Sequence, residues 1–327
     1  MKILLAVDAV LPVQKYGGTE RVVYGLGKAL GAMGHDVTFL CAEGSVCPFA
    51  RVIERNPEIA PERQVPADID ITHFNNYIPS FDWDRPYVVT YHGNGIPTDK
   101  IVPNSIFVSR DHARRHGCDS WVYNGLDWDD YGIPDLSLSR SGFHFLGNAA
   151  WRVKNVKGAI DVVKRVPGET MEVLGGKRFN FKMGMRFTLS PRIHFHGMVD
   201  NNAKRDYITR SKGLIFPVTW HEPFGLCIVE SLYYGSPVFA TPYGSLPELV
   251  IPEVGHLSND SSEMIKLLKE SDSFNPVKTH EYAADNFNAG VMARNYLKCY
   301  EKVLNGGKLI EGRPLPDMSD YRHLEWR

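Results

Sequence analysis

Residues 221–250 read HEPFGLCIVESLYYGSPVFATPYGSLPELV, and this stretch is the best guide to the fold of the chain. It places two glutamates, Glu222 and Glu230, eight positions apart, with a Pro-Phe-Gly-Leu turn between them that leads into a predicted helix. An apolar run at residues 213–217 comes before it and predicts a strand. A strand, a turn and a helix in this order form the α/β unit in which ligands bind at the carboxyl end of the sheet.

The same stretch also contains groups that could bind a ligand. Two carboxylates at such a position can each accept hydrogen bonds from neighbouring hydroxyls, as a polyol ligand requires. Backbone N–H groups at the helix start, near Gly225 and Leu226, suit an anionic or hydroxyl-rich ligand. Isolated glutamates are usually solvated residues on a helix surface. Here the segments G-S-P-V at 235–238 and G-S-L-P-E-L-V at 244–250 make the pattern far more specific.

Length and composition indicate an ordinary globular protein of about two domains. A net charge of −1 gives no reason to expect nucleic acid as a partner. No apolar run approaches the roughly 20 residues that span a bilayer, and the start of the chain does not read as a signal peptide. The five cysteines contain no CxxC pair, so the sequence predicts neither disulfides nor a zinc site. We therefore expect a cytoplasmic protein.

Strand-like and helix-like segments alternate along the whole chain, which predicts parallel sheets wound on both faces by helices. A Ser-, Gly- and Pro-rich break at residues 130–142 separates two such series. Helices are predicted from Thr19, after the capping box at 260–263, and over 280–304 with a break at 288–290. The expected strands are 2–7, 37–41, 70–73, 87–91 and 105–108 in the first series, and 143–147, 171–174, 193–196, 213–217 and 238–241 in the second.

The stretch 221–250 resembles the E-x7-E signature of the retaining glycosyltransferases of family 4. The resemblance runs from Gly17 to Glu248 and implies the GT-B fold, in which two Rossmann-like domains face each other across a cleft. Residues 1–137 would then form the acceptor-binding domain and 138–299 the donor-binding domain, with the tail 300–327 packing back on the first.

The family also implies roles for the residues of this stretch. Its first glutamate contacts a hydroxyl of the donor sugar and its second holds the ribose of the nucleotide, which implies these roles for Glu222 and Glu230. Phe224, Gly225 and Leu226, in the turn between them, are expected to bind the donor as well.

Two segments of the first domain extend the resemblance. YGGTER at 16–21 lacks the G-x-G-x-x-G fingerprint, but its glycines permit close backbone approach and the helix start favours an anion. It resembles the family loop that faces the diphosphate, which implies donor binding by Gly17 and Gly18. His92, at the end of the strand 87–91, resembles a histidine of the family that contacts the donor sugar. Taken by itself, such a histidine is more often structural.

The segment LGNAAWRVKNV at 146–156 resembles the family's phosphate-binding segment, which carries an arginine and a lysine. Lys154 takes the lysine position, but the arginine position falls on Asn148. A departing nucleoside diphosphate gains negative charge that fixed cations stabilise, so we expect Arg152 to supply the missing cation, with Lys157 as a weaker candidate. The alternative is a solvated basic loop.

Two loops of the second domain, at 175–177 and 197–199, resemble those that sandwich the nucleobase. Met198 and Val199 would line its apolar face. His194 and His196 lie two apart on one face of a strand. With no carboxylate or cysteine partner evident in the sequence, they are expected to be structural.

The resemblance implies transfer of a sugar, from a UDP- or GDP-sugar above all, to a hydroxyl of a glycan, a glycolipid or a small molecule. Retention through a covalent intermediate on Glu222 is disfavoured against same-face attack, in which the leaving diphosphate takes the acceptor's proton. No cofactor and no metal are expected. Residues 42–66 and 74–84 are the expected acceptor walls. Their aromatic residues are equally compatible with core packing: Phe74, Tyr77, Phe81 and Trp83.

Several alternatives stay open. A nucleotide-sugar epimerase shares the fold and the donor pocket, and a phosphorylase shares the fold but needs pyridoxal phosphate and a longer chain. A catalytically silent nucleotide-sugar binding protein is a third alternative, which the uncharged Asn148 keeps open. A peripheral contact with the inner face of a membrane is also open, through a basic or aromatic surface of the first domain.

Overall fold

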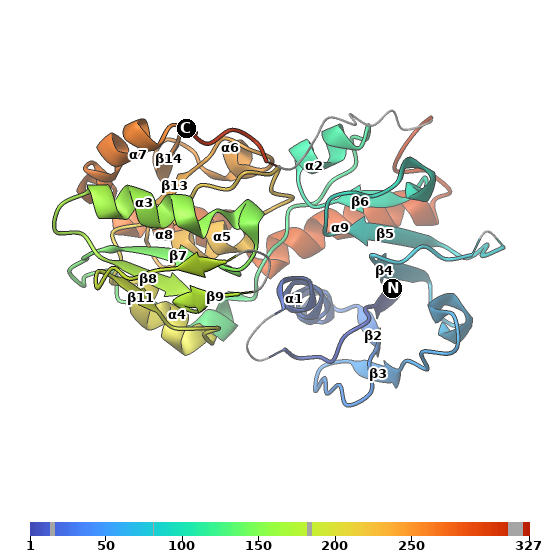
Figure 1. Ribbon diagram of the computed structural model, residues 1–327. Helices are drawn as coiled ribbons and strands as arrows, with labels where there is room; N and C mark the ends of the chain where they lie inside the picture. Colours follow the sequence, from blue (N-terminus) through green and yellow to red (C-terminus); the bar gives the residue numbers. More distant parts are fainter. Residues whose placement is uncertain (14–16, 81, 182–184, 313–322) are drawn as a thin grey trace. The chain divides into compact units, whose positions relative to one another are not determined.

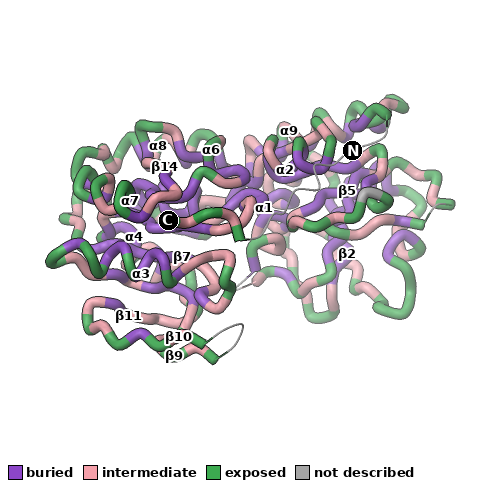
Figure 2. Tube along the Cα trace, turned by 45° about the horizontal axis from the view of Figure 1, so that its top comes forward, coloured by how far each residue is buried: buried purple, intermediate pink, exposed green. Residues whose placement is uncertain are grey.

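The computed structural model describes residues 1–13, 17–80, 82–181, 185–312 and 323–327. The described chain divides into two compact units, 1–127 with 287–312 and 128–286 with 323–327. Each unit holds a six-stranded sheet with helices against it (Figure 1). In each, the central strands are buried while many connecting loops are exposed (Figure 2). The predicted α/β class is therefore confirmed.

The first sheet has the strand order β3-β2-β1-β4-β5-β6, and every pair in it is parallel. The order reverses at β1, so the carboxyl ends of β1 and β4 form the switch point where ligands bind in such sheets. Helix α1 opens directly after Gly17 and buries one apolar face. The elements are β1 Lys2–Ala6, α1 Gly18–Ala32, β2 Asp36–Cys41, β3 Arg51–Glu54, β4 Ile71–Asn75, β5 Tyr87–Tyr91, β6 Ser105–Phe107, α2 Arg110–Arg115 and α9 Ala289–Leu304.

Helix α9 returns to the first unit and is fixed there by buried polar contacts. The hydroxyl of Tyr300 lies 2.7 Å from Nδ1 of His73 on β4. That of Tyr296 lies 3.1 Å from Oγ1 of Thr90 on β5. Further along, Ile310 is buried and its N–H donates to the carbonyl of Pro103. The chain thus crosses to the first unit at residue 287, earlier than the expected position 300.

The second sheet repeats the topology with the order β11-β8-β7-β12-β13-β14, again all parallel. Its switch point lies between β7 and β12. A short antiparallel hairpin of β9 and β10 stands apart from this sheet. The elements are β7 Phe143–Leu146, α3 Val156–Arg165, β8 Met171–Leu174, β9 Phe179–Asn180, β10 Arg186–Phe187, β11 Ile193–Phe195, α4 Asn201–Ile208, β12 Leu214–Phe216, α5 Leu226–Tyr233, β13 Val238–Ala240, α6 Leu246–Leu249, β14 Gly255–Leu257, α7 Ser261–Leu268 and α8 Pro276–Asn286.

The borders of the units differ from the expected ones in two places. The first unit ends at Asp127, ten residues before the expected border at 137. Residues 323–327 pack on the second unit, where Leu324 N–H donates to the carbonyl of Thr219 and Arg327 N–H to that of Asn259. The expected tail 300–327 is therefore shared between the units. None of the helices that the structure describes is long and apolar enough to cross a membrane.

Candidate functional site

The most prominent polar feature of the second unit is a buried ion pair at its switch point. Lys154 follows β7 in a short 3-10 helix (Arg152–Lys154), and Glu222 follows β12. Lys154 Nζ donates to Glu222 Oε2 over 2.6 Å, and Trp220 Nε1 donates to the same oxygen over 2.9 Å. The side chains of Lys154 and Glu222 are only 13% and 7% exposed. Two charges this well buried persist only when paired and hydrogen-bonded, as these are.

The backbone around Lys154 is held by a left-handed residue. Asn155 has a φ of 51° and caps α3 by accepting a hydrogen bond from Gly158 N–H. Its amide also donates to the carbonyl of Pro217 over 2.9 Å. Lys154 Nζ then lies 5.1 Å from the centre of the Phe216 ring and 4.9 Å from that of Trp220. These ring faces stabilise the ammonium in addition to the carboxylate.

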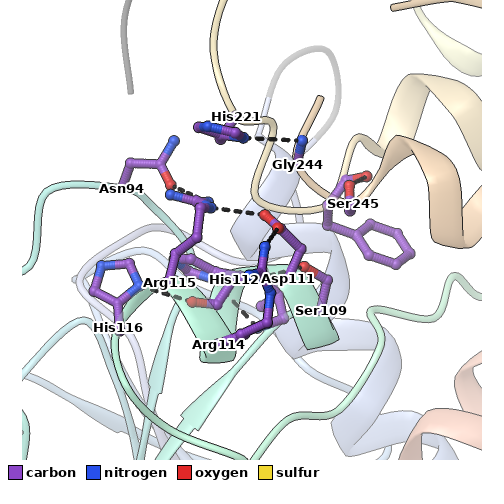
Figure 3. Close-up of polar contacts among 12 residues, drawn as sticks. Asn94, Ser109, Asp111, His112, Arg114, Arg115, His116, His221, Gly244 and Ser245 are labelled. Carbon is purple, nitrogen blue, oxygen red and sulfur yellow. Dashed lines mark hydrogen bonds and ion pairs between the residues drawn. The ribbon is translucent and has the colours of Figure 1, made fainter. Parts of the chain in front are cut away.

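The backbone of Glu222 is fixed by the loop that follows β13. Glu222 pairs with Gly244 in a parallel bridge, and its carbonyl accepts a hydrogen bond from Ser245 N–H. A Cβ at position 244 would lie 2.3 Å from both N and O of Glu222, so only glycine fits. Gly244 N–H also donates to Nδ1 of His221 (Figure 3). Residues from both ends of the sequence stretch 221–250 thus fold into one local structure.

Glu230 forms a second buried ion pair on helix α5. Its Oε1 accepts hydrogen bonds from Lys204 Nζ over 2.6 Å and from the Tyr131 hydroxyl over 2.8 Å. Both Lys204 and Glu230 are buried. Neither Lys204 nor Tyr131 was predicted, because they lie 26 and 99 positions away in the sequence.

The turn between the two glutamates is built as the sequence predicts. Gly225 has a φ of 90° and lies at the N-cap of α5, with Leu226 as the first helical residue. Phe224 is buried, and its carbonyl accepts a hydrogen bond from the Ser245 hydroxyl. Burial raises the pKa of the Cys227 thiol well above its usual range, so this cysteine is not a thiolate nucleophile at neutral pH.

The position that lacks the expected arginine, Asn148, and the residue expected to replace its charge, Arg152, differ in environment. Asn148 Oδ1 accepts a hydrogen bond from Ala150 N–H, so this residue shapes the turn after β7 and carries no charge. Arg152 is exposed and starts the 3-10 helix that ends in Lys154. Its predicted role toward a diphosphate stays a prediction.

The expected nucleobase loops are joined to the turn after β7. Ala149 N–H donates to the carbonyl of Gly175, and Gly197 N–H donates to that of Gly176. Met198 is 45% exposed and Val199 is half-buried, so both present apolar surface beside these loops.

In the first unit, the expected residues lie around the switch point of the first sheet. Gly17 is buried with a φ of 148°, and Gly18 opens α1. A pocket of about 270 Å³ lies beside them, lined among others by Asp8, Glu20 and Asn75. Tyr16, the first residue of the motif, lies outside the described residues.

His92 is a neutral hydrogen-bonded residue at the end of β5. Its Nε2 lies 2.9 Å from Asn75 Oδ1, and its N–H donates to Asn76 Oδ1. Burial lowers the pKa of His92 to about 4, so the imidazole is uncharged at neutral pH. Asn75 is the last residue of β4 and Asn76 follows it, and no sequence pattern indicated either residue.

The loop after His92 is anchored by helix α2. Arg115 donates to Asp111 Oδ2 over 2.7 Å and to Asn94 Oδ1 over 3.0 Å (Figure 3). His112 Nε2 lies 3.0 Å from the carbonyl of Gly93. Ser109 caps the helix by accepting a hydrogen bond from His112 N–H.

The two histidines of the second sheet have a partner that the sequence did not reveal. His194 and His196 do have a carboxylate partner, because Glu172 on the neighbouring strand β8 bonds both rings, Oε1 to His194 Nδ1 and Oε2 to His196 Nε2. The register pairs His194 with Glu172 directly, a cross-strand relation that a single sequence does not reveal. Among the described residues no group of three or more His, Cys, Asp or Glu side chains could hold a metal ion.

The aromatic residues of the expected acceptor walls lie in different environments. Phe74 is fully buried and belongs to the core of the first unit. Tyr77 donates to Glu62 Oε2, and Trp83 lies beneath the guanidinium of Arg85. Phe81 lies outside the described residues.

Solved structures with the same architecture define the class of fold. The chain matches AviGT4, a glycosyltransferase involved in Avilamycin A biosynthesis, with a TM-score of 0.75 at 20% identity, over 94% of this chain and 99% of that one. It matches the HepE protein of Anabaena in complex with UDP-glucose with a TM-score of 0.66 at 17% identity, over 92% and 100%. The predicted GT-B fold is therefore confirmed.

Sequence comparisons support glycosyl transfer for the second unit. Residues 140–270 match the family described as glycosyl transferases group 1. Two uncharacterized proteins in the cps region of Klebsiella pneumoniae, of 41.2 and 42.6 kDa, are 30% identical over 116 residues and 26% identical over 99 residues. These segments cover 33% and 29% of this chain, and only 32% and 24% of the respective relatives.

Proposed function

We propose that the chain is a retaining glycosyltransferase that moves a sugar from a nucleotide-sugar donor to a hydroxyl acceptor. The observation that carries the proposal is the buried Lys154–Glu222 pair at the switch point of the second sheet. Glu230 lies on the helix that follows, and all three residues fall within the segment that matches the group 1 family. Crystal structures of HepE, which is structurally similar to this chain, contain UDP or UDP-glucose.

We assign a role in donor binding to each buried carboxylate of this site. Glu222, held as a carboxylate by Lys154 and Trp220, accepts hydrogen bonds from hydroxyls of the donor sugar. Glu230 accepts hydrogen bonds from the ribose hydroxyls, and Lys204 and Tyr131 fix the orientation of the Glu230 carboxylate. Met198 and Val199 line the nucleobase.

The leaving group needs positive charge. Lys154 Nζ, with Arg152 beside it in the sequence, is proposed to stabilise the diphosphate as its bond to the sugar breaks. The backbone amides near Gly17 and Gly18 and the neutral His92 are proposed to contact the donor from the first unit. The resemblance in the sequence supports these roles.

We propose same-face attack for the chemical step. The bond between the anomeric carbon and the diphosphate oxygen breaks, the acceptor oxygen bonds to that carbon from the same side, and the acceptor's proton passes to the departing diphosphate. Glu222 is already engaged by two donors on one oxygen, which fits a binding role better than that of a nucleophile. Independence from metal ions and cofactors is part of this proposal.

The donor is proposed to be a UDP- or GDP-sugar, and the acceptor a glycan, a glycolipid or a small molecule. The cps-region relatives favour polysaccharide biosynthesis in the cytoplasm as the setting. The experiment is turnover of candidate donors with EDTA present, with the anomeric configuration of the product read by NMR. An inverted product would overturn the retaining mechanism, and a donor changed at sugar C2 without transfer would indicate the epimerase.

A catalytically silent binding protein is the second candidate, and one observation favours it. The position where related enzymes carry a phosphate-binding arginine is Asn148, whose side chain closes a turn. Slow hydrolysis of a donor in the absence of acceptor would exclude this candidate.

A further inference from the structure

We propose that Asn75 holds the imidazole of His92 in the tautomer with its proton on Nε2, so that Nδ1 accepts a hydrogen bond from a sugar hydroxyl. Asn75 is then a positioning residue, which acts on the substrate through His92. That a sugar binds beside His92 rests on the proposed function, whereas the tautomer is a property of the free protein.

Asn75 lies where three neighbouring strands of the first sheet end. It is the last residue of β4, and β4 runs between β1 and β5. Its side chain is buried, and Nδ2 donates to the carbonyl of Ala6 at the end of β1 over 3.1 Å. Its Oδ1 lies 2.9 Å from Nε2 of His92, which directly follows β5. One amide therefore links the ends of all three strands.

The two contacts of Asn75 determine which way its amide faces. A carbonyl oxygen only accepts hydrogen bonds, so the amide group that faces the carbonyl of Ala6 is the NH₂ group. The amide atom that faces His92 is then the carbonyl oxygen, which also only accepts. Nε2 of His92 must therefore carry the proton of this hydrogen bond.

The ring of His92 carries only this one proton at neutral pH. Burial lowers the pKa of His92 to about 4, and no ionised group among the described residues contributes to this shift. His73 on β4 and His112 on α2 interact electrostatically with His92, but burial lowers the pKa of each, so both are neutral as well. With the ring uncharged and Nε2 protonated, Nδ1 holds a lone pair.

The lone pair on Nδ1 has no competing partner. Within the part of the chain that the structure describes, no residue is hydrogen-bonded to Nδ1 of His92. The backbone of His92 is fixed separately, because its N–H donates to Oδ1 of Asn76 over 2.9 Å and Asn76 has a left-handed φ of 54°. Nδ1 is thus held in place by the protein and left available for a ligand.

A sugar hydroxyl is the ligand group that fits this lone pair. A hydroxyl can donate a hydrogen bond to Nδ1, whereas a diphosphate or carboxylate oxygen only accepts and would meet the lone pair of Nδ1 with one of its own. His92 therefore recognises a hydroxyl and does not bind the diphosphate. If His92 were only structural, its contact with Asn75 would stabilise the fold without affecting the pH dependence of turnover.

The first test measures the tautomer in the full chain labelled with ¹⁵N-histidine. The signals of His92 are assigned by their absence from the H92Q variant. Long-range ¹H–¹⁵N correlation spectra between pH 8 and pH 6 are expected to show a protonated Nε2 and an unprotonated Nδ1. Saturation with UDP-glucose or GDP-mannose, whichever stabilises the chain, is expected to move the Nδ1 signal without protonating this nitrogen.

The second test is the N75D variant, which keeps an acceptor for Nε2 but adds a negative charge beside the ring. This charge is expected to raise the pKa of His92 by roughly one unit or more, since it favours the protonated ring. An imidazolium cannot accept from a hydroxyl, so the acid limb of kcat/KM is expected to move to higher pH by the same amount. N305D adds the same charge at an exposed residue after α9 and is expected to change neither quantity.

Several outcomes would overturn the proposal. A proton on Nδ1 in the wild type would do so without any variant, and so would an Nδ1 signal that does not move at saturation with the nucleotide sugar. An unchanged acid limb in a folded N75D variant with a raised His92 pKa would show that the contact is only structural. An equal shift of the limb in N75D/H92Q would show that the shift does not come from His92.

Two further results are separated by design. If circular dichroism shows that N75D is unfolded, N75S replaces it; its shorter side chain removes the contact, and His92 is expected to populate both tautomers. A single unchanged tautomer in N75S would overturn the role of Asn75. If neither nucleotide sugar binds, the proposed function and the hydroxyl contact fail together, whereas a failure of the tautomer alone leaves the proposed function intact.

Discussion

Lys154 Nζ and Glu222 Oε2 lie 2.6 Å apart in the second unit, and both side chains are almost completely buried. The two residues are 68 positions apart in the sequence, and each follows the carboxyl end of a central strand of the same sheet. Removing one partner leaves the other charge buried and unpaired.

A double-mutant cycle tests the importance of this ion pair for stability. K154M and E222Q are each expected to destabilise the chain by about 3 kcal/mol, because each leaves an uncompensated buried polar group. The double variant K154M/E222Q is expected to lose less than the sum, measured as the shift of the thermal unfolding midpoint. Additive effects would show that the two side chains do not interact.

The same variants separate stability from catalysis. K154M is expected to lower kcat by roughly a hundredfold or more, since a fixed cation at a developing anion contributes on this scale. K266Q on α7, an exposed lysine, is the control and is expected to retain full activity. A folded K154M variant with normal turnover would contradict the role proposed for this lysine.

Glu230 and its partners predict a graded effect on nucleotide affinity. E230A is expected to abolish detectable nucleotide binding, because it removes the proposed ribose acceptor. Tyr131→Phe deletes one hydrogen bond to Oε1, and is expected to weaken binding by roughly fivefold, equivalent to about 1 kcal/mol. Isothermal titration with the preferred nucleotide measures both. Unchanged affinity in a folded E230A variant would remove Glu230 from the site.

Gly244 tests whether the loop after β13 positions Glu222. Gly244→Ala would place a Cβ 2.3 Å from the backbone N and O of Glu222, at a φ of 68°. It is expected to lower stability severely and to abolish donor turnover. Gly168 has a similar φ of 79° with no atom near its Cβ position, so Gly168→Ala should lose only about 1 kcal/mol from the backbone alone. Equal effects in the two variants would show that the close contact at Gly244 is unimportant.

His73 predicts a pH dependence of stability. Burial lowers its pKa from 6.5 to about 3, with a smaller contribution from His92. Between these values the unfolded chain binds a proton that the folded chain does not, so the free energy of unfolding falls as the pH falls below 6.5. The slope for this one group approaches about 1.4 kcal/mol per pH unit.

Urea unfolding at pH 7, 6, 5 and 4 measures this dependence. His73→Gln is expected to flatten the decline, whereas His323→Gln, which changes an exposed histidine, should leave it unchanged. An identical decline in the His73 variant would show that its burial does not control the acid response.

The sequence predicted the regular elements well where the apolar pattern was strong. The strands β5 and β8 have the expected bounds, and Asp260 caps α7 by accepting from Ser262 and Glu263 N–H. The strands β3 and β14 were not predicted, because they are short edge strands with partly exposed residues. The local pattern of apolar residues does not indicate that such short segments pair at the edge of a sheet.

The site was predictable only in part, for a related reason. The resemblance singled out Glu222, Glu230 and Lys154 one by one, but their partners come from distant parts of the chain. Lys204 reaches Glu230 from helix α4, and no local spacing indicates this contact. The carboxylate between His194 and His196 was missed in the same way, since Glu172 meets them only through strand register.

The central claim is that the second unit binds a nucleotide-sugar donor through Glu230 and Lys154 without a metal ion. Its most direct test is a thermal-shift series with UDP, GDP, ADP, CMP and TDP, each with and without EDTA. We predict that one nucleotide raises the unfolding temperature equally in EDTA, and that E230A removes this shift. If no nucleotide stabilises the chain, or if stabilisation disappears with EDTA, the proposed donor site is contradicted.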